Sequence, residues 1–148
     1  MEHRRAEDQY RRIGLAAPAL LLIPETGDPT LALLPPSGPP PRAYLQAAIR
    51  TAGAVALVLT CEAWAINVPD DVGSGPIEAL PLPARDPRRE GAIVSFGVLP
   101  TPDGPLSVIR GTRIRRGAFG TVLEPEPDTY SSVRTGDGTT AWLASLFD

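Results

Sequence analysis

The sequence contains no lysine, one cysteine and one histidine, and each scarcity narrows the chemistry open to the chain. All fourteen basic residues among its 148 are arginine. One cysteine cannot form an internal disulfide, so an intracellular location is the default expectation. Cys61 lies in an apolar run, which predicts a buried and inert thiol. His3 lies in a charged N-terminal segment, where we expect an exposed side chain with no part in a catalytic triad or metal site.

Several functional signatures are missing as well. The chain has no Gly-x-Gly-x-x-Gly or Walker motif, no calcium-binding loop and no secretory signal peptide. Its net charge of −3 argues against general nucleic-acid binding. We therefore predict no catalytic, cofactor-binding or metal-binding residues, and a location in the cytoplasm or within an assembled particle.

Proline, by contrast, is abundant: the chain has 18, more than twice the usual share of about 5%. The prolines concentrate at 35–41, 69–87 and 100–105, between apolar runs, and indicate rigid connections between elements. With 43% hydrophobic and 21% charged residues, a chain of this length is typical of one globular domain.

Apolar periodicity and turn residues predict an α+β fold. Helices are expected at 2–13, at about 42–52 and, as a short terminal element, at 140–147. Strands are expected at 19–23, 30–34, 54–68, 92–99, 106–116 and 118–123, while 124–137 is expected to run along the surface. We therefore predict a mostly antiparallel sheet of three to six strands with one clear helix and short terminal helices. The predicted parts are a charged N-terminal helix (1–14), a core domain (15–123) and a polar segment with a C-terminal aromatic helix (124–148).

Glu62 is the one carboxylate in the most apolar stretch, residues 54–68. The stretch approaches the length of a short membrane span, but its carboxylate and β-branched alternation favour a buried strand, so no membrane insertion is expected. Because an unpaired buried charge is costly, we expect a structural ion pair between Glu62 and Arg88 or Arg89. The alternative is a pocket where Glu62, Trp64 and these arginines converge, with Glu62 as a general base.

Arg110, Arg113, Arg115 and Arg116 form the one basic cluster of the sequence. In a strand, Arg113 and Arg115 share one face, and Arg110 and Arg116 share the other. The cluster could contact the phosphate of a nucleic acid or of a small ligand. The alternative is a charged edge strand that prevents unwanted pairing. No aromatic residues alternate with the arginines to stack on bases, so nucleic-acid binding is not favoured.

The two ends of the chain offer candidate interface residues. Tyr10 and Ile13 give the N-terminal helix a thin apolar stripe, which we expect to hold the helix only weakly to its own domain. The C-terminal helix would present four large apolar side chains on one side, and such side chains are common interface anchors: Trp142, Leu143, Leu146 and Phe147. The alternative is that they close the core.

The segment Cys61-Glu-Ala-Trp-Ala65, a proline-rich gap and Asp86-Pro-Arg-Arg-Glu-Gly-Ala-Ile-Val94 together resemble a pattern in small uncharacterised bacterial and phage-encoded proteins. The resemblance covers residues 42–100 and implies no activity, cofactor or catalytic residue, but it favours a phage or mobile-element accessory protein. We expect a non-catalytic interaction or structural protein that binds a protein partner or itself. A small ligand-binding or hydrolase domain centred on Glu62, and a nucleic-acid-associated protein using Arg110–Arg116, are the alternatives.

Overall fold

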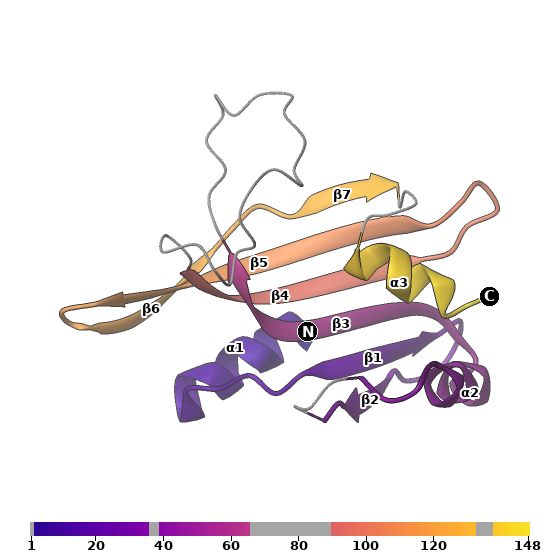
Figure 1. Cartoon of the computed structure of the whole chain (residues 1–148), viewed down its shortest axis with the longest axis horizontal. Coiled ribbons are helices and arrows are strands. Elements are labelled where there is room, and N and C mark those ends of the chain that lie inside the picture. The colour runs from indigo at the N-terminus through magenta and orange to yellow at the C-terminus, as the bar shows by residue number, and fades with distance from the viewer. Residues whose placement is uncertain (1, 36–38, 66–89, 133–137) are drawn as a thin grey trace.

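The computed structural model describes residues 2–35, 39–65, 90–132 and 138–148, which form one seven-stranded antiparallel sheet and three helices (Figure 1). The helices are α1 (Glu2–Ile13), α2 (Arg42–Ala52) and α3 (Thr139–Ser145). The strands are β1 (Ala19–Pro24), β2 (Thr30–Leu33), β3 (Ala54–Ala65), β4 (Glu90–Leu99), β5 (Leu106–Gly117), β6 (Gly120–Pro125) and β7 (Thr129–Ser132). Among these elements, no helix is long and apolar enough to cross a membrane.

The strand order is β2-β1-β3-β4-β5-β6, and β7 pairs with the same edge of β5 as β6 does. The β4–β5 hairpin follows from its turn residues: Gly104 has a φ of 111° and its amide hydrogen-bonds the Thr101 carbonyl at 3.0 Å. Gly53 ends α2 in the left-handed conformation, with a φ of 63°, and the chain enters β3 directly.

The two faces of the sheet are covered by different helices. Helices α2 and α3 pack on the face we call the α2/α3 face, where Leu20, Leu57, Val98 and Leu143 are buried together. Helix α1 packs on the opposite face, the α1 face, over a smaller cluster that includes Tyr10. Figure 1 shows α1 at one end of the sheet and the α2 and α3 pair at the other. The central strands therefore contribute to two separate cores.

The predicted α+β class and antiparallel pairing are confirmed. The sheet has seven strands, one more than the predicted upper limit, because β7 lies within residues 124–137, where only a surface segment was expected. The predicted helix at 42–52 is present as α2.

The expected roles of the chain ends need correction. Leu143 and Leu146 are fully buried in the core under α3, and Tyr10 is buried beneath α1, so these three are not available as interface residues. Trp142 and Phe147 are partly buried and pack against the same core as Leu143. Only Ile13 is exposed, at 64%. A short helix with few apolar residues can still dock when a sheet supplies the complementary surface.

Candidate interaction site

A buried polar network joins α1 to the sheet, and His3 is its centre. His3 Nδ1 lies 2.8 Å from Ser95 Oγ, and His3 Nε2 lies 2.8 Å from Thr112 Oγ1. Ser95 Oγ lies 2.7 Å from Thr60 Oγ1, and Thr112 donates to Glu7 at the far end. The prediction that His3 is exposed is therefore wrong: its side chain is buried under the first turn of α1 with both ring nitrogens hydrogen-bonded.

The directions of these hydrogen bonds fix the tautomer of His3. Thr112 has one hydroxyl proton and donates it to Glu7, so it must accept from Nε2–H of His3. Burial lowers the pKa of His3, and the Glu7 carboxylate only partly offsets this effect, so the neutral ring is favoured. Nδ1 of that ring accepts from Ser95, which in turn accepts from Thr60. The hydroxyl of Ser95 is buried beneath α1, and we interpret the network as the device that docks the helix.

The carboxylate of Glu62 is exposed, so the prediction that it is buried is wrong. Glu62 lies directly across from the buried Ile93 in the strand pairing, and Glu62 Oε1 accepts a hydrogen bond of 2.6 Å from the backbone amide of Ala16. Because the charge is solvated, it does not need an arginine partner. The predicted partners Arg88 and Arg89, and the side chain of Trp64, lie outside the described residues.

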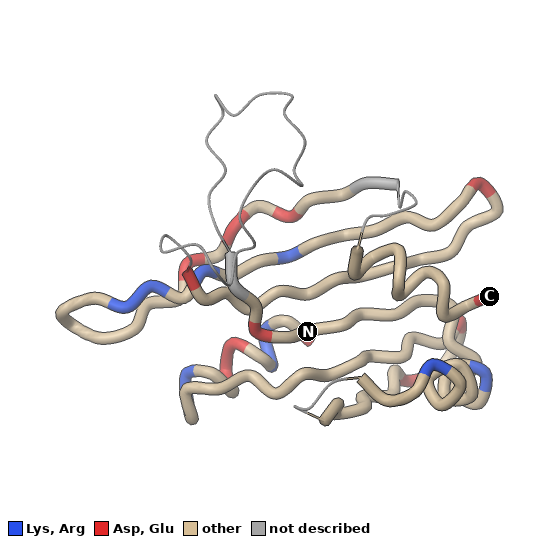
Figure 2. Tube along the Cα trace, in the orientation of Figure 1, with Lys and Arg blue, Asp and Glu red and all other residues tan. Residues whose placement is uncertain are grey.

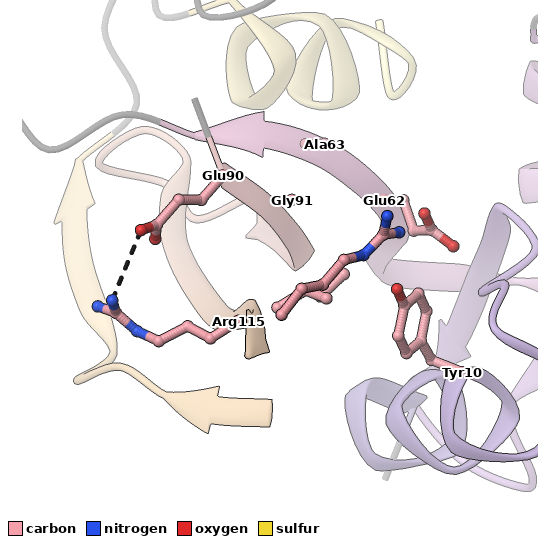
Figure 3. Close-up of a pocket in the computed structure, with 8 residues that line it drawn as sticks. Tyr10, Glu62, Ala63, Glu90, Gly91 and Arg115 are labelled. Carbon is pink, nitrogen blue, oxygen red and sulfur yellow. Dashed lines mark ion pairs between the residues drawn. The ribbon is translucent and has the colours of Figure 1, made fainter. Parts of the chain in front are cut away.

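Glu62 borders a cavity of about 630 Å³ at the ends of β3 and β5 and the start of β4. Figure 3 shows Glu62 and Tyr10 on one side and Glu90, 3.5 Å from Arg115 in an ion pair, on the other. Eight described residues line it: Tyr10, Glu62, Ala63, Glu90, Gly91, Ile114, Arg115 and Arg116. The described lining mixes both charges with the apolar side chains of Ala63 and Ile114.

Three arginines of the predicted basic cluster form ion pairs with acids that follow them in the chain. Arg110 binds Asp128 through two hydrogen bonds of 2.9 and 2.7 Å. Arg113 pairs with Glu126, and Arg115 pairs with Glu124. Figure 2 shows these positive and negative residues gathered toward the same end of the sheet. The hydrogen bonds from Arg110 hold the pKa of Asp128 below its usual value.

The strand register places Arg113 and Arg115 on the α2/α3 face and Arg110 and Arg116 on the α1 face, as the alternation predicts. A phosphate group would have to compete with the carboxylates already bound to three of these side chains. Phosphate contact therefore stays a prediction, and its physical support is weaker than the sequence alone suggests. The sequence did contain the signal for these pairs, because Glu124, Glu126 and Asp128 recur at alternate positions.

A hairpin formed by the end of β5 and the start of β6 extends beyond the other described strands and helices, and we call residues 115–124 the arm (Figure 1). Every side chain from 115 to 122 is exposed. The two strands of the arm are held by their pairing from Arg115 to Gly120 and by the Arg115–Glu124 ion pair. Phe119 occupies the turn at the tip and is fully exposed, and Val122 is 58% exposed. The sequence did not single out Phe119: a strand was expected at 118–123, and the structure instead places Phe119 in the turn before β6.

Among the described residues, no group of three or more histidine, cysteine, aspartate or glutamate side chains could hold a metal ion. Cys61 is half-buried, and burial raises the pKa of its thiol, which disfavours the reactive thiolate. In comparisons with protein families, with characterised proteins and with solved structures, this chain has no match. Among the described elements, the arm has exposed side chains, Phe119 above all, for which packing within the fold gives no reason.

Proposed function

We propose that the protein is a non-catalytic interaction or assembly protein that binds a protein partner through the arm. The observation that carries this proposal is the full exposure of Phe119 at the tip of a paired, projecting hairpin. The origin in a phage or mobile element stays a prediction from the sequence.

Phe119 has no role in the core. Burying a phenylalanine side chain stabilises a fold by about 1.5–3 kcal/mol, and this chain forgoes that gain. Tight turns usually use glycine, proline, asparagine, aspartate or serine, and Gly120, with a φ of 113°, already meets the conformational demand here. An aromatic displayed on a rigid support is the kind of residue that anchors protein interfaces.

The two alternative functions have less support. A ligand-binding or hydrolase site at Glu62 would use the polar groups around the cavity, but Glu62 already accepts a hydrogen bond from the Ala16 amide and Glu90 already pairs with Arg115. Nucleic-acid binding would need free arginines, whereas Arg110, Arg113 and Arg115 already pair with acids. The net charge of −3 also opposes it.

The test compares Phe119→Ser with Tyr44→Ser, because Tyr44 is also an exposed aromatic residue, at 66%, and lies on α2, away from the arm. Each tagged variant is expressed in the natural host, and the native mass and the co-purifying chains are measured. Loss of a buried aromatic anchor costs about 2 kcal/mol or more of binding, which is roughly a 30-fold weaker Kd. We expect Phe119→Ser to lose its partner while Tyr44→Ser keeps it. If Phe119→Ser retains the parent's assembly and its partner, the arm does not carry the function.

A further inference from the structure

The cavity beside α1 has a buried apolar floor and a charged rim. Tyr10 and Ile114 at its floor are each 7% exposed, whereas Glu62 and Arg116 at its rim are exposed. Its volume of about 630 Å³ lies within the range of about 300–1,000 Å³ that is typical of small-molecule sites. A ligand with an apolar group and a charged end matches this arrangement.

The strands bring the two rim residues to the same side of the sheet. Thr60 and Thr112 belong to the polar network under α1, so their side chains lie on the α1 face. Side chains two or four residues further along a strand share that face. Glu62 follows Thr60 by two residues on β3, and Arg116 follows Thr112 by four residues on β5. Both charged side chains therefore border the cavity from the side that carries α1.

Gly91 keeps the floor of the cavity open. It pairs with Ile114 across β4 and β5, and a Cβ atom at Gly91 would lie 3.5 Å from Cδ1 of Ile114. A side chain at this position would occupy the space over Ile114. The missing side chain therefore leaves the apolar surface of Ile114 available to a molecule in the cavity.

Two polar groups of the cavity have no partner among the residues that the structure describes: the hydroxyl of Tyr10 and the guanidinium of Arg116. Although Tyr10 is buried, its hydroxyl oxygen is not among the fully enclosed atoms, and Figure 3 shows it pointing away from α1 toward the other lining residues. A buried tyrosine hydroxyl usually has a hydrogen-bond partner. Here a molecule in the cavity must supply it.

The charges of the lining define the class of ligand. Glu90 and Arg115 already pair with each other, but Glu62 and Arg116 form no ion pair with any described residue. A purely anionic ligand would be attracted by Arg116 and repelled by Glu62, and a purely cationic ligand would meet the reverse. A ligand that carries one charge of each sign can satisfy both residues.

We propose that this cavity binds a small zwitterion with an apolar side chain, of amino-acid to dipeptide size. Its carboxylate accepts hydrogen bonds from Arg116 and from the hydroxyl of Tyr10, and its apolar group covers Ile114. Its ammonium group donates to Glu62, which has a second oxygen beyond the one that binds the Ala16 amide. Glu62 thus acts as a binding group and not as a base. The site is distinct from the tip of the arm, so the inference goes beyond the proposed function.

The test measures binding to the full chain by isothermal titration calorimetry with four probes. L-leucine and leucyl-leucine carry both charges, 4-methylpentanoate lacks the amine of leucine, and 3-methylbutylamine lacks its carboxylate. We expect L-leucine or leucyl-leucine to bind with a Kd of about 1 mM or tighter, the upper end of the usual range for small substrates. Each single-charge analogue should bind at least about tenfold more weakly, because it loses one charged hydrogen-bonding group.

Variants of the lining assign the contacts. Arg116→Gln and Glu62→Gln should each weaken binding of the zwitterion by about tenfold or more, and both sites are exposed, so the fold should persist. Arg12→Gln, at an exposed arginine of α1 outside the cavity, is the matched control and should leave the Kd unchanged. Gly91→Ala should also weaken binding, because its methyl group takes the space over the floor at an ordinary contact distance.

Three outcomes would overturn the inference. One is the absence of binding by either zwitterion up to about 10 mM, tenfold above the usual upper limit. Another is equal binding of the zwitterion and its single-charge analogues, and the third is an unchanged Kd in both Arg116→Gln and Glu62→Gln. Phe119→Ser should leave binding of the zwitterion intact. A failure of the arm to bind its partner and a failure of the cavity to bind its ligand are therefore separate results.

Discussion

Replacing His3 by alanine should destabilise the protein strongly, although sequence reasoning makes it an exposed residue near the end of the chain. The substitution removes the hydrogen bonds to Ser95 and Thr112, each worth about 0.5–1.5 kcal/mol net. It also leaves a space beneath α1, where large-to-small changes add a further cost. We expect a total loss of about 2–4 kcal/mol in the free energy of unfolding.

The assay is urea unfolding followed by circular dichroism, with Arg12→Ala as the matched control. Arg12 is an exposed residue of the same helix, so its substitution should change stability by no more than about 0.5 kcal/mol. For a chain of this length, the His3→Ala loss corresponds to a fall in Tm of roughly 10 °C. Equal stability of the two variants would refute the docking role of His3 and restore the view of α1 as a loosely held helix.

Three further predictions test other parts of the structure. Because burial lowers the pKa of His3, the folded protein binds fewer protons than the unfolded chain near the pKa of this residue. The contribution of His3 to stability is therefore present above a pH of about 6.5 and is lost as the pH falls below that value. His3→Gln should flatten the dependence of Tm on pH in this window, and an unchanged slope would contradict the prediction. Leu143→Ala should lower the free energy of unfolding by about 2–5 kcal/mol because Leu143 is fully buried. Deletion of residues 139–148 should therefore unfold the core, and a cooperative melt at the parent's Tm after the deletion would contradict this prediction. Arg113→Met should lower the free energy of unfolding by more than the loss of an exposed ion pair, about 1 kcal/mol, and by less than the loss of a buried one, about 3–5 kcal/mol, because Arg113 is largely buried beside Glu90 and Glu126. Arg115→Met, at an exposed pair, is the control and should lower the free energy of unfolding by less.

Local signals explain which elements the sequence predicted well. The β4–β5 hairpin depends on Thr101 and Gly104, which are three residues apart, and the end of α2 depends on Gly53 alone. These structures are decided by neighbouring residues, so turn and capping rules recover them.

Long-range contacts explain what was missed. His3 meets Ser95 and Thr112 across 92 and 109 residues, and no spacing rule connects them. The hydroxyl residues Thr60, Ser95 and Thr112 did interrupt apolar strands, and they were the available hint of a polar partner. Glu62 was misjudged because its apolar neighbours in the sequence do not reveal which side chains of β3 the other elements cover.

Strand β7 was missed because its four residues pair with β5 only once β5 is in place. Edge strands of this length carry little propensity of their own. For the candidate site, the sequence identified the arginines but not their acid partners, and it did not single out Phe119. Exposure at the tip of a hairpin depends on how far the hairpin extends beyond the sheet, which is a property of the assembled fold.

Strand β3 lies between the α2/α3 core and the polar network under α1, and this has a consequence for which changes the chain can tolerate. Leu57 and Leu59 face α2 and α3, while Val58 and Thr60 face the other side of the sheet. Deleting one residue from β3 would exchange the two sets, placing the Thr60 hydroxyl among leucines and a leucine beside the Ser95 hydroxyl. A shifted pairing would therefore disrupt the α2/α3 core and the polar network under α1 at the same time. Changes in length should accumulate in the arm, where the paired residues have no second surface to match.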